Sequence, residues 1–349
     1  MIESPVGAIT RRVDEDLARG IDAARRAPSA HNIQPWMFES YGGGVLLGWN
    51  PSRDLPHGDP TRHYMLVGLG AAAESFVLGV AAAGGSAFVT FDWTASEHRA
   101  AHLERSDDAP SSDDIDLGRA IPYRQTTRWP QTRRAIPLAA IDEMTREAVV
   151  RGCRLLVITD RRRIRRAARL TGRGTARNLA DRDVFGEFAR LLRMSHRDPA
   201  YWRDGLTLQT LARGRFRAMS RRIALIPGVM RLMVSVGLHH LAASTQQRLM
   251  LRSSAIGLLV APSTEPADIF MGGRAMLRVW LRATRQGLRV HPMTAALDHQ
   301  STREALSAVF GARDGEAPMV ALRLGYGHAA PQSPRLPADE VMVSGSRLR

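Results

Sequence analysis

Residues 27–36 read Ala27-Pro28-Ser29-Ala30-His31-Asn32-Ile33-Gln34-Pro35-Trp36, and this stretch decides how the fold is read. A helical pattern of apolar residues precedes it between residues 14 and 27. Pro28 ends that helix, and Pro35 with Trp36 opens an extended segment. The stretch is therefore predicted to be a loop between packed elements. It presents hydroxyl, imidazole and amide groups, which are groups that binding loops use.

The first third of the chain continues as a hairpin, a long helix and a strand. Gly42-Gly43-Gly44 separates two short apolar runs, which predicts a hairpin. A long, Ala-rich and nearly uncharged run predicts a fully buried central helix. The predicted elements are a helix over 14–27, strands over 37–40 and 45–49, a helix over 68–83 and a strand over 87–91. The polar, acidic residues 106–116 are interpreted as a linker.

A similar pattern follows the linker, with a long basic interruption. The predicted elements are a helix over 138–150, a strand over 155–158, mostly helix over 161–252, a strand over 256–261, a helix over 272–285, an extended segment over 288–290 and a last strand over 321–327. Residues 70–87 and 273–290 share a frame of Gly, long helix, Gly and strand. This frame indicates a weak internal repeat.

Composition narrows the class of protein. At 349 residues with 44% hydrophobic residues, the chain fits a globular protein of one large or two medium domains. Cys153 is the single cysteine, so no intrachain disulfide forms and a cytoplasmic location is expected. Cys153 lies in an apolar run and is expected to be an inert strand residue. Residues 1–5 lack the features of a secretory signal.

The formal net charge of +15 does not by itself indicate a nucleic-acid partner. All 49 basic residues are Arg, as high-GC coding produces, and no nucleic-acid-binding motif accompanies them. The most apolar segment, 223–243, is interrupted by proline, glycine, arginine and histidine, so we expect a buried or lid helix pair and no membrane partner. No Cys/His cluster has metal-ligand spacing, so no metal is expected.

The opening stretch resembles the Ala-Pro-Ser-x-x-Asn-x-Gln-Pro-Trp segment that nitroreductase-type flavoproteins carry at the FMN isoalloxazine ring. Its His-Asn variant resembles the Acg family, the dormancy-associated, nitroreductase-like FMN-binding proteins of actinobacteria. The resemblance implies an α+β fold of mixed or antiparallel sheets packed by helices. It also implies a set of ring-facing residues in the loop: Pro28, Ser29, Ala30, Asn32 and Gln34.

The same resemblance implies a phosphate site in the second half of the chain. Arg124, Thr126 and Arg128 match the family's Arg-x-Ser/Thr-x-Arg/Lys motif, and Arg335 follows the last strand, where a basic phosphate ligand usually stands. A phosphate dianion favours guanidinium and hydroxyl donors because charge-assisted hydrogen bonds are the strong ones. The alternatives are a surface Arg-rich turn at 124–128 and a solvated tail residue at 335.

Residues 289–294 match the family position where a backbone N–H faces flavin N5. The cofactor-binding residues expected here are His291, Pro292 and Met293, with the backbone near Met293 and Thr294 beside N5. Such a donor would stabilise charge at N5. His291 itself is expected to pack or hydrogen-bond and not to donate a proton. No catalytic acid or base is required.

The two halves of the chain carry different parts of this site. The first has the ring loop but no phosphate motif, and the second has the phosphate motif but no ring loop. We therefore interpret the chain as two fused nitroreductase-like copies, residues 1–116 and 117–349, with a helical insertion or lid over about 161–252. Such a pair is expected to hold one FMN per chain, as a monomeric pseudo-dimer or within a homo-oligomer.

Two functions follow from the resemblance. The first is an oxidoreductase that passes a hydride from NAD(P)H to flavin N5 and then to a nitroaromatic or quinone-type acceptor. The second is a protein that stores or sequesters FMN under a closed lid without turnover. In both, the partners are small molecules.

Overall fold

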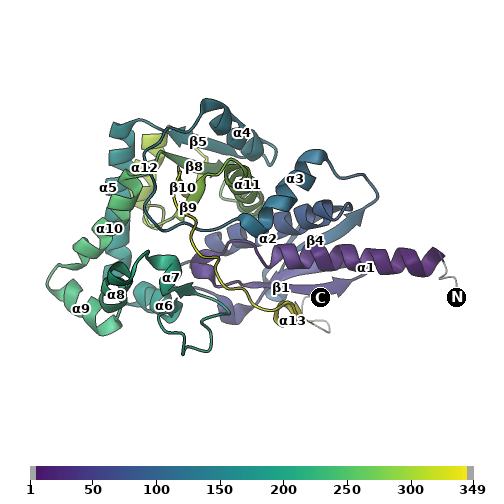
Figure 1. Ribbon diagram of the computed structural model, residues 1–349, viewed down its shortest axis with the longest axis horizontal. Coiled ribbons are helices and arrows are strands. Elements are labelled where there is room, and N and C mark those ends of the chain that lie inside the picture. The colour runs from purple at the N-terminus through teal and green to yellow at the C-terminus, as the bar shows by residue number, and fades with distance from the viewer. Residues whose placement is uncertain (1–4, 344–349) are drawn as a thin grey trace.

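The computed structural model describes residues 5–343 and has the α+β architecture predicted from the sequence (Figure 1). Residues 1–4, part of the segment in which no secretory signal is expected, lie outside the described residues. Two sheets enclose a pair of long helices, α2 (His63–Ala82) and α11 (Pro266–Arg285). Helix α2 packs on the first sheet, α11 packs on the second, and the two helices pack on each other.

The first sheet has the strand order β11-β1-β2-β4-β3. Its strands are β1 (Trp36–Tyr41), β2 (Gly44–Trp49), β3 (Ser86–Thr94), β4 (Arg99–Ser106) and β11 (Met342–Val343). Neighbours are antiparallel except β11, which adds in parallel to β1. The C-terminal segment therefore returns to complete the sheet that the N-terminal third builds.

The second sheet is antiparallel, with the order β5-β8-β10-β9. Its strands are β5 (Arg154–Ile158), β8 (Ala255–Ala261), β9 (Arg289–Met293) and β10 (Ala317–Gly325). Apart from β11, both sheets place their strands, taken in chain order, as first, second, fourth and third. In both, the long central helix stands between the second and third strands.

Two glycines let the central helices touch backbone to backbone. A Cβ on Gly70 would lie 2.0 Å from the carbonyl oxygen of Phe270, and one on Gly273 would lie 2.1 Å from that of Val67. The two contacts are related in sequence, because 273 minus 70 and 270 minus 67 both give 203. Only residues without a side chain permit so close a crossing.

A buried ion network joins the same helices. Glu74 on α2 is fully buried and receives hydrogen bonds from Arg274 (2.7 Å), Arg278 (3.0 Å) and Arg151 (2.7 Å). Burial alone would raise the pKa of Glu74, but these three guanidinium groups outweigh burial and hold that pKa below its ordinary value. The carboxylate is thus ionised and paired inside the core.

Most predicted elements are present, with shifted ends. Helix α1 (Pro5–Ala24) and the two central helices begin earlier than predicted. Helix α4 (Leu138–Val149) and the hairpin are confirmed. The predicted linker is partly wrong, because helix α3 (Ser112–Ala120) begins inside it with Ser111 as its N-cap. Strand β4 and helix α12 (Gln300–Phe310) were not predicted.

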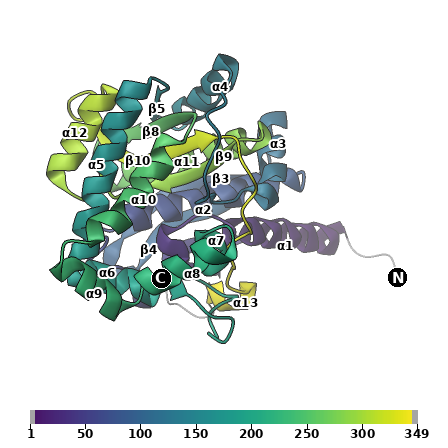
Figure 2. The ribbon, with the colours of Figure 1, turned by 60° about the vertical axis from the view of Figure 1, so that its left-hand side comes forward.

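The basic segment after β5 is mostly helical, as predicted. Its elements are α5 (Arg161–Ala180), α6 (Arg182–Arg190), β6 (Leu192–Arg193), β7 (Leu206–Thr207), α7 (Leu208–Leu211), α8 (Arg215–Ala224), α9 (Pro227–Ser235) and α10 (His239–Leu251). Figure 2 shows these helices gathered on one side of the molecule, beside the ends of both sheets. The final turn, α13 (Ala338–Val341), leads into β11.

Candidate functional site

The loop after α1 is held in an unusual backbone conformation. His31, Asn32 and Gln34 have φ values of 48°, 61° and 54°, a region that residues other than glycine seldom occupy. The Ser29 hydroxyl accepts a hydrogen bond from the Gln34 N–H at 2.9 Å and closes the turn. Such strain persists only where the surroundings impose it, and it is concentrated at functional sites.

The arginine segment 124–128 lies against the second sheet. Thr126 forms a parallel bridge with Val290 of β9, and the Thr127 N–H donates to the Val290 carbonyl at 2.9 Å. This pairing brings the segment beside the end of β9. The Arg124 guanidinium stacks 4.6 Å from the centre of the Trp280 ring, and burial lowers the pKa of Arg124 to about 10.

Arg335 belongs to the C-terminal tail, and its guanidinium group lies close to that of Arg124. Both guanidinium groups donate to the same carbonyl oxygen, that of Arg26, at 2.7 Å from Arg124 and 3.0 Å from Arg335. Arg335 also donates to Asn32 Oδ1 at 2.9 Å, and its Nε is buried without a partner among the described residues. Burial and then the charges of Arg124, Arg26 and Arg25 lower the pKa of Arg335 well below its ordinary value.

These segments surround one cavity of about 560 Å³, a size typical of small-molecule sites. It lies between the loop, the ends of α2 and β9, the C-terminal tail and the helices of the basic segment 161–252, for which the name insertion is kept only as a label. Nearly all the residues expected at the cofactor line it: Pro28, Ser29, Ala30, Asn32, Arg124, Thr126, Arg128, His291, Pro292, Met293, Thr294 and Arg335. Segments as distant as residues 28 and 335 thus meet at one space.

Gln34 is the expected site residue that does not line the cavity. It is fully buried, its amide donates to the Arg203 carbonyl at 2.9 Å, and its Oε1 accepts from the Leu336 N–H at 2.9 Å. The side chain therefore ties the loop to the insertion and to the C-terminal tail. Both ends of the amide are engaged by backbone, and a place for Gln34 at the flavin ring stays a prediction.

His291 is placed by a buried arginine. The Arg323 guanidinium lies 3.0 Å from His291 Nδ1. A guanidinium can only donate, so Nδ1 is the acceptor and the ring proton is on Nε2. This pairing agrees with the expectation that His291 forms hydrogen bonds within the protein.

His31, a loop residue not included among the expected ligands, also lines the cavity. Its ring packs edge-on against Phe188 of α6, with centroids 5.0 Å apart. Desolvation, followed by the charge of Arg128, lowers the pKa of His31 to about 4. The imidazole is therefore neutral at pH 7.

A polar cluster at the cavity wall was missed by the sequence reasoning. The Tyr64 hydroxyl donates to Asp298 Oδ1 at 2.6 Å, and the Asn178 amide donates to Asp298 Oδ2 at 2.5 Å. Burial raises the pKa of Asp298 despite these bonds. The three residues come from α2, α5 and the loop before α12, so no local motif could have indicated them.

The insertion forms one wall of the cavity and is fastened to the loop side. The Asn32 amide donates to the Gly205 carbonyl at 3.2 Å. The Glu187 carboxylate on α6 accepts from the backbone N–H groups of His57 (3.0 Å) and Gly58 (2.7 Å). Side chains of α5, α6, α8, α9 and α10 also face the cavity. These contacts hold the insertion over the site.

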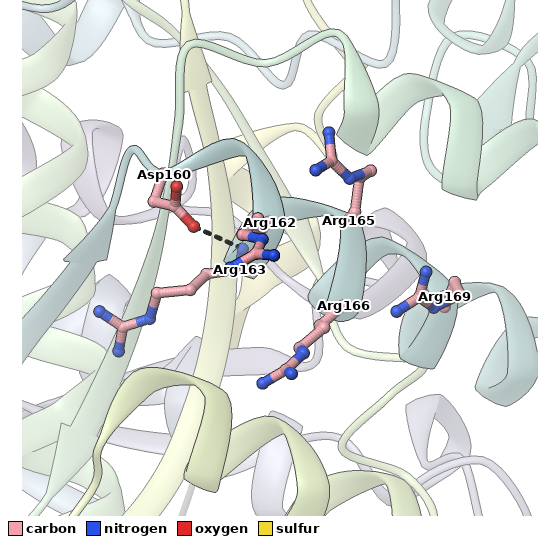
Figure 3. Close-up of a pocket in the computed structure, with 6 residues that line it drawn as sticks. All are labelled: Asp160, Arg162, Arg163, Arg165, Arg166 and Arg169. Atoms are coloured by element: carbon pink, nitrogen blue, oxygen red, sulfur yellow. Dashed lines mark hydrogen bonds between the residues drawn. The ribbon is translucent and has the colours of Figure 1, made fainter.

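A second hollow, of about 380 Å³, lies on the surface at the start of α5. It is lined by Asp160, Arg162, Arg163, Arg165, Arg166 and Arg169. Figure 3 shows their guanidinium groups pointing in different directions. The arginines therefore do not converge on one ligand.

Three further features concern other kinds of site. Within residues 5–343, no group of three or more His, Cys, Asp or Glu side chains could hold a metal ion. Cys153 is buried, and desolvation together with Asp268 raises its pKa to about 12, so the thiol is unreactive. Helix α2 is long and apolar enough to cross a membrane, and 89% of its most apolar window is buried inside the protein, as in a core helix.

No family model matches the chain. It is 27% identical over 350 residues to a Mycobacterium tuberculosis protein provisionally named an NAD(P)H nitroreductase, found in two strains, with 97% of this chain and 95% of the relative covered.

Solved structures give a more distant likeness. The FMN-dependent nitroreductase NfnB of Mycobacterium smegmatis, in complex with NADPH, is 16% identical with a TM-score of 0.41. A nitroreductase of Desulfitobacterium hafniense with bound FMN is 12% identical with a TM-score of 0.41. Each alignment covers 66% of this chain and 98% of the other. In sequence, the chain is similar over nearly its whole length to a protein named as a nitroreductase.

Proposed function

We propose that the chain binds one FMN in the 560 Å³ cavity and acts as an NAD(P)H-dependent oxidoreductase of the nitroreductase-like kind. The observation that carries the proposal is the meeting of Arg124 and Arg335 on the Arg26 carbonyl. No carboxylate forms an ion pair with either guanidinium among the described residues. Two like charges held this close in protein favour an anion between or beside them.

FMN fits this donor set. Its phosphate would lie at Arg124 and Arg335, where guanidinium groups can form charge-assisted bonds and where Arg335 Nε has no partner among the described residues. Thr126 and Ser29 add hydroxyl groups at the cavity. The wall formed by Met276, Val320 and the insertion suits a planar ring. When bound, FMN supplies a ring that accepts and returns a hydride.

In the proposed site, the chain's own residues would bind and orient the flavin and shield it from water. Asn32 holds Arg335 in place through its Oδ1 and joins the loop to the insertion through its amide. Met293 and Thr294 present backbone at the end of β9, and we propose that this backbone lies beside flavin N5. The insertion excludes water from one side of the cavity, which strengthens the electrostatic interactions inside it.

We also propose that residues 1–116 and 117–349 are two fused copies, with the insertion over about 161–252. The matching strand orders of the two sheets support this proposal. So do the contacts of Gly70 with Phe270 and of Gly273 with Val67, because they exchange equivalent residues as a two-fold interface does. Within residues 5–343 the arginine pair and the strained loop occur once each, which favours one FMN per chain and a site complete within one chain.

The acceptor is proposed to be a nitroaromatic or quinone-type compound, since the cavity wall offers mainly apolar contacts. The alternative is an FMN-storing protein without turnover. Its support is the set of bonds that fasten the insertion over the cavity at Gly205 and at Glu187. NADPH oxidation in the presence of a nitroaromatic separates the two. Turnover well above that of free FMN supports the oxidoreductase, and its absence in FMN-loaded protein supports storage.

Binding of FMN and riboflavin to the flavin-free protein tests the site itself. Replacing Arg124 with Ala is expected to weaken FMN binding by about 10- to 100-fold, the value of one or two charge-assisted bonds, and to leave riboflavin binding nearly unchanged. Arg166→Ala, an exposed arginine on α5, is the matched control. Equal losses for FMN and riboflavin, or no loss for either, would show that the phosphate does not bind at Arg124.

A further inference from the structure

A second surface of the insertion has no role in the cavity. Between Asp204 and Glu265 the chain contains no acidic residue. The same segment contains eight arginines: Arg213, Arg215, Arg217, Arg221, Arg222, Arg231, Arg248 and Arg252. Helices α8 and α9 belong to it and lie beside each other at the lower left corner of the molecule in Figure 1, and α9 lies at the lower left corner in Figure 2 as well. Among the arginines whose side chains the structure describes, Arg213, Arg222, Arg231, Arg248 and Arg252 are exposed, so this part of the surface is basic.

The same corner exposes large apolar side chains. Phe216 is 93% exposed, Leu232 65% and Leu241 62%. We call the exposed apolar side chains of this corner the outer apolar face, and they are Phe216, Met219, Ile223, Ile226, Leu232, Val236, Leu238 and Leu241. Isolated exposed apolar residues are common, but eight within residues 216–241, on three consecutive helices and the turns between them, mark an interaction surface.

The outer apolar face is separate from the side chains that serve the cavity. Ala224 and Leu225 of the α8 end, Met233 of α9 and Ala242 of α10 line the cavity. The residues of the outer apolar face do not line it. The helices are thus apolar on two sides, and the flavin site accounts for one of them only.

We propose that the outer apolar face binds the surface of an anionic lipid bilayer. Apolar side chains interspersed with arginines, without acidic residues, are the composition of helices that lie in a membrane interface. The apolar side chains would enter the boundary between headgroups and acyl chains. The arginines would bind lipid phosphates, and long basic side chains can reach the headgroups while their stems remain in apolar surroundings.

The geometry favours lying on the membrane over crossing it. Helices α8 and α9 have 10 and 9 residues. At 1.5 Å per residue each is about 15 Å long, half of the roughly 30 Å hydrocarbon core. The expectation of no membrane partner was drawn from the lack of a spanning run at 223–243, and peripheral binding does not require one.

Charge also decides between lipid and a second copy of the chain. A two-fold contact through this face would place Arg222 and Arg231 of both copies in one interface, with no acidic residue in the segment to pair with them. Anionic lipid offers the opposite charge. Membrane leaflets that face the cytoplasm, the location expected from the composition, are rich in such lipid.

Vesicle co-sedimentation of the full chain tests the proposal. Binding is expected to vesicles of phosphatidylglycerol with phosphatidylcholine, to weaken with salt, and to be much weaker to phosphatidylcholine alone. Replacing Phe216 and Leu232 together with Ser should reduce binding by about tenfold or more, since both side chains leave the interface. Leu138→Ser, at a 76% exposed leucine on α4, is the matched control and should bind like the wild type.

Variants that remove positive charge and a measurement of the oligomeric state complete the test. Arg222→Gln with Arg231→Gln should weaken binding to anionic vesicles by about tenfold, and Arg119→Gln at an exposed site on α3 should not. The proposal is overturned if the wild type does not sediment with anionic vesicles or if the Phe216/Leu232 variant binds as well as the wild type. It is equally overturned if sedimentation velocity shows a dimer that only this variant dissociates, because the face would then join two copies.

Discussion

Replacing Gly273 with Ala probes the contact on which the two halves of the molecule depend. The new Cβ would lie 2.1 Å from the Val67 carbonyl oxygen, whereas ordinary van der Waals contact begins at 3.4 Å. The three atoms nearest to the new Cβ are the O, C and Cα atoms of Val67, which are all backbone, so no side chain can rotate away. The helices α2 and α11 must therefore separate by about 1.3 Å at their crossing, the difference between the two distances.

The cost has two parts. Forcing a methyl group into a packed helix crossing costs about 1–3 kcal/mol. The separation also stretches the bonds from Glu74 to Arg274 and Arg278, whose loss leaves charge buried without its partner. We expect the free energy of unfolding to fall by about 3 kcal/mol or more, measured by urea denaturation followed by circular dichroism.

The matched control is Gly186→Ala on α6, where a new Cβ meets nothing within 4 Å. That change should be neutral or stabilise by up to about 1 kcal/mol, because Ala is the better helix former. The double variant of Gly70 and Gly273 should cost less than the two single variants added together, since one separation of the helices relieves both clashes. A loss below about 1 kcal/mol in Gly273→Ala, or full additivity in the double variant, would refute the close crossing.

Two further predictions concern buried carboxylates. Glu74→Gln should lower the free energy of unfolding by about 3–5 kcal/mol, because three guanidinium groups lose their counter-ion. The control is Asp116→Asn, which breaks an exposed ion pair with Arg285 and should change the free energy of unfolding by under about 1 kcal/mol. Similar losses for the two variants in urea denaturation would contradict the buried network. Asp59 accepts a hydrogen bond from the Met65 N–H at 2.8 Å, and burial raises its pKa to about 7. Its folded form keeps a proton that the unfolded chain releases near pH 4, so folding takes up a proton and stability falls as pH rises from about 4 to 7. Asp59→Asn should remove this part of the pH dependence in urea melts at a series of pH values, and an unchanged slope would mean that Asp59 is ionised in the folded protein.

The elements that the sequence predicted well are those with strong local signals. The turn of the hairpin is formed by Gly42-Gly43-Gly44, and two of these glycines have positive φ. Helix α2 is apolar on nearly every side, as helices in the core of a protein are. Strand β4 was missed because five of its eight residues are polar and it becomes a strand by pairing between β2 and β3.

The residues of the candidate site likewise fall into those that a local motif predicts and those that only tertiary packing brings together. The loop at 28–34 and the motif at 124–128 carry chemistry in short stretches, and of the site residues expected in them only Gln34 does not line the cavity. The cluster of Tyr64, Asn178 and Asp298 has no such pattern, because tertiary packing alone brings its members together. The return of the C-terminal tail as β11, which fixes the path that carries Arg335, is likewise a long-range pairing of two residues. Neither could be predicted from local sequence.

The central claim is that one chain holds one FMN in one cavity. It is tested most directly by loading the flavin-free protein with FMN, removing the excess, and measuring the FMN extracted per chain by absorbance against the protein concentration. One FMN per chain is expected for the wild type, with the bound flavin lost on dilution in Arg124→Ala. A stoichiometry of two would contradict the assignment of a single ring loop and a single phosphate site, and a stoichiometry of zero would contradict FMN binding altogether.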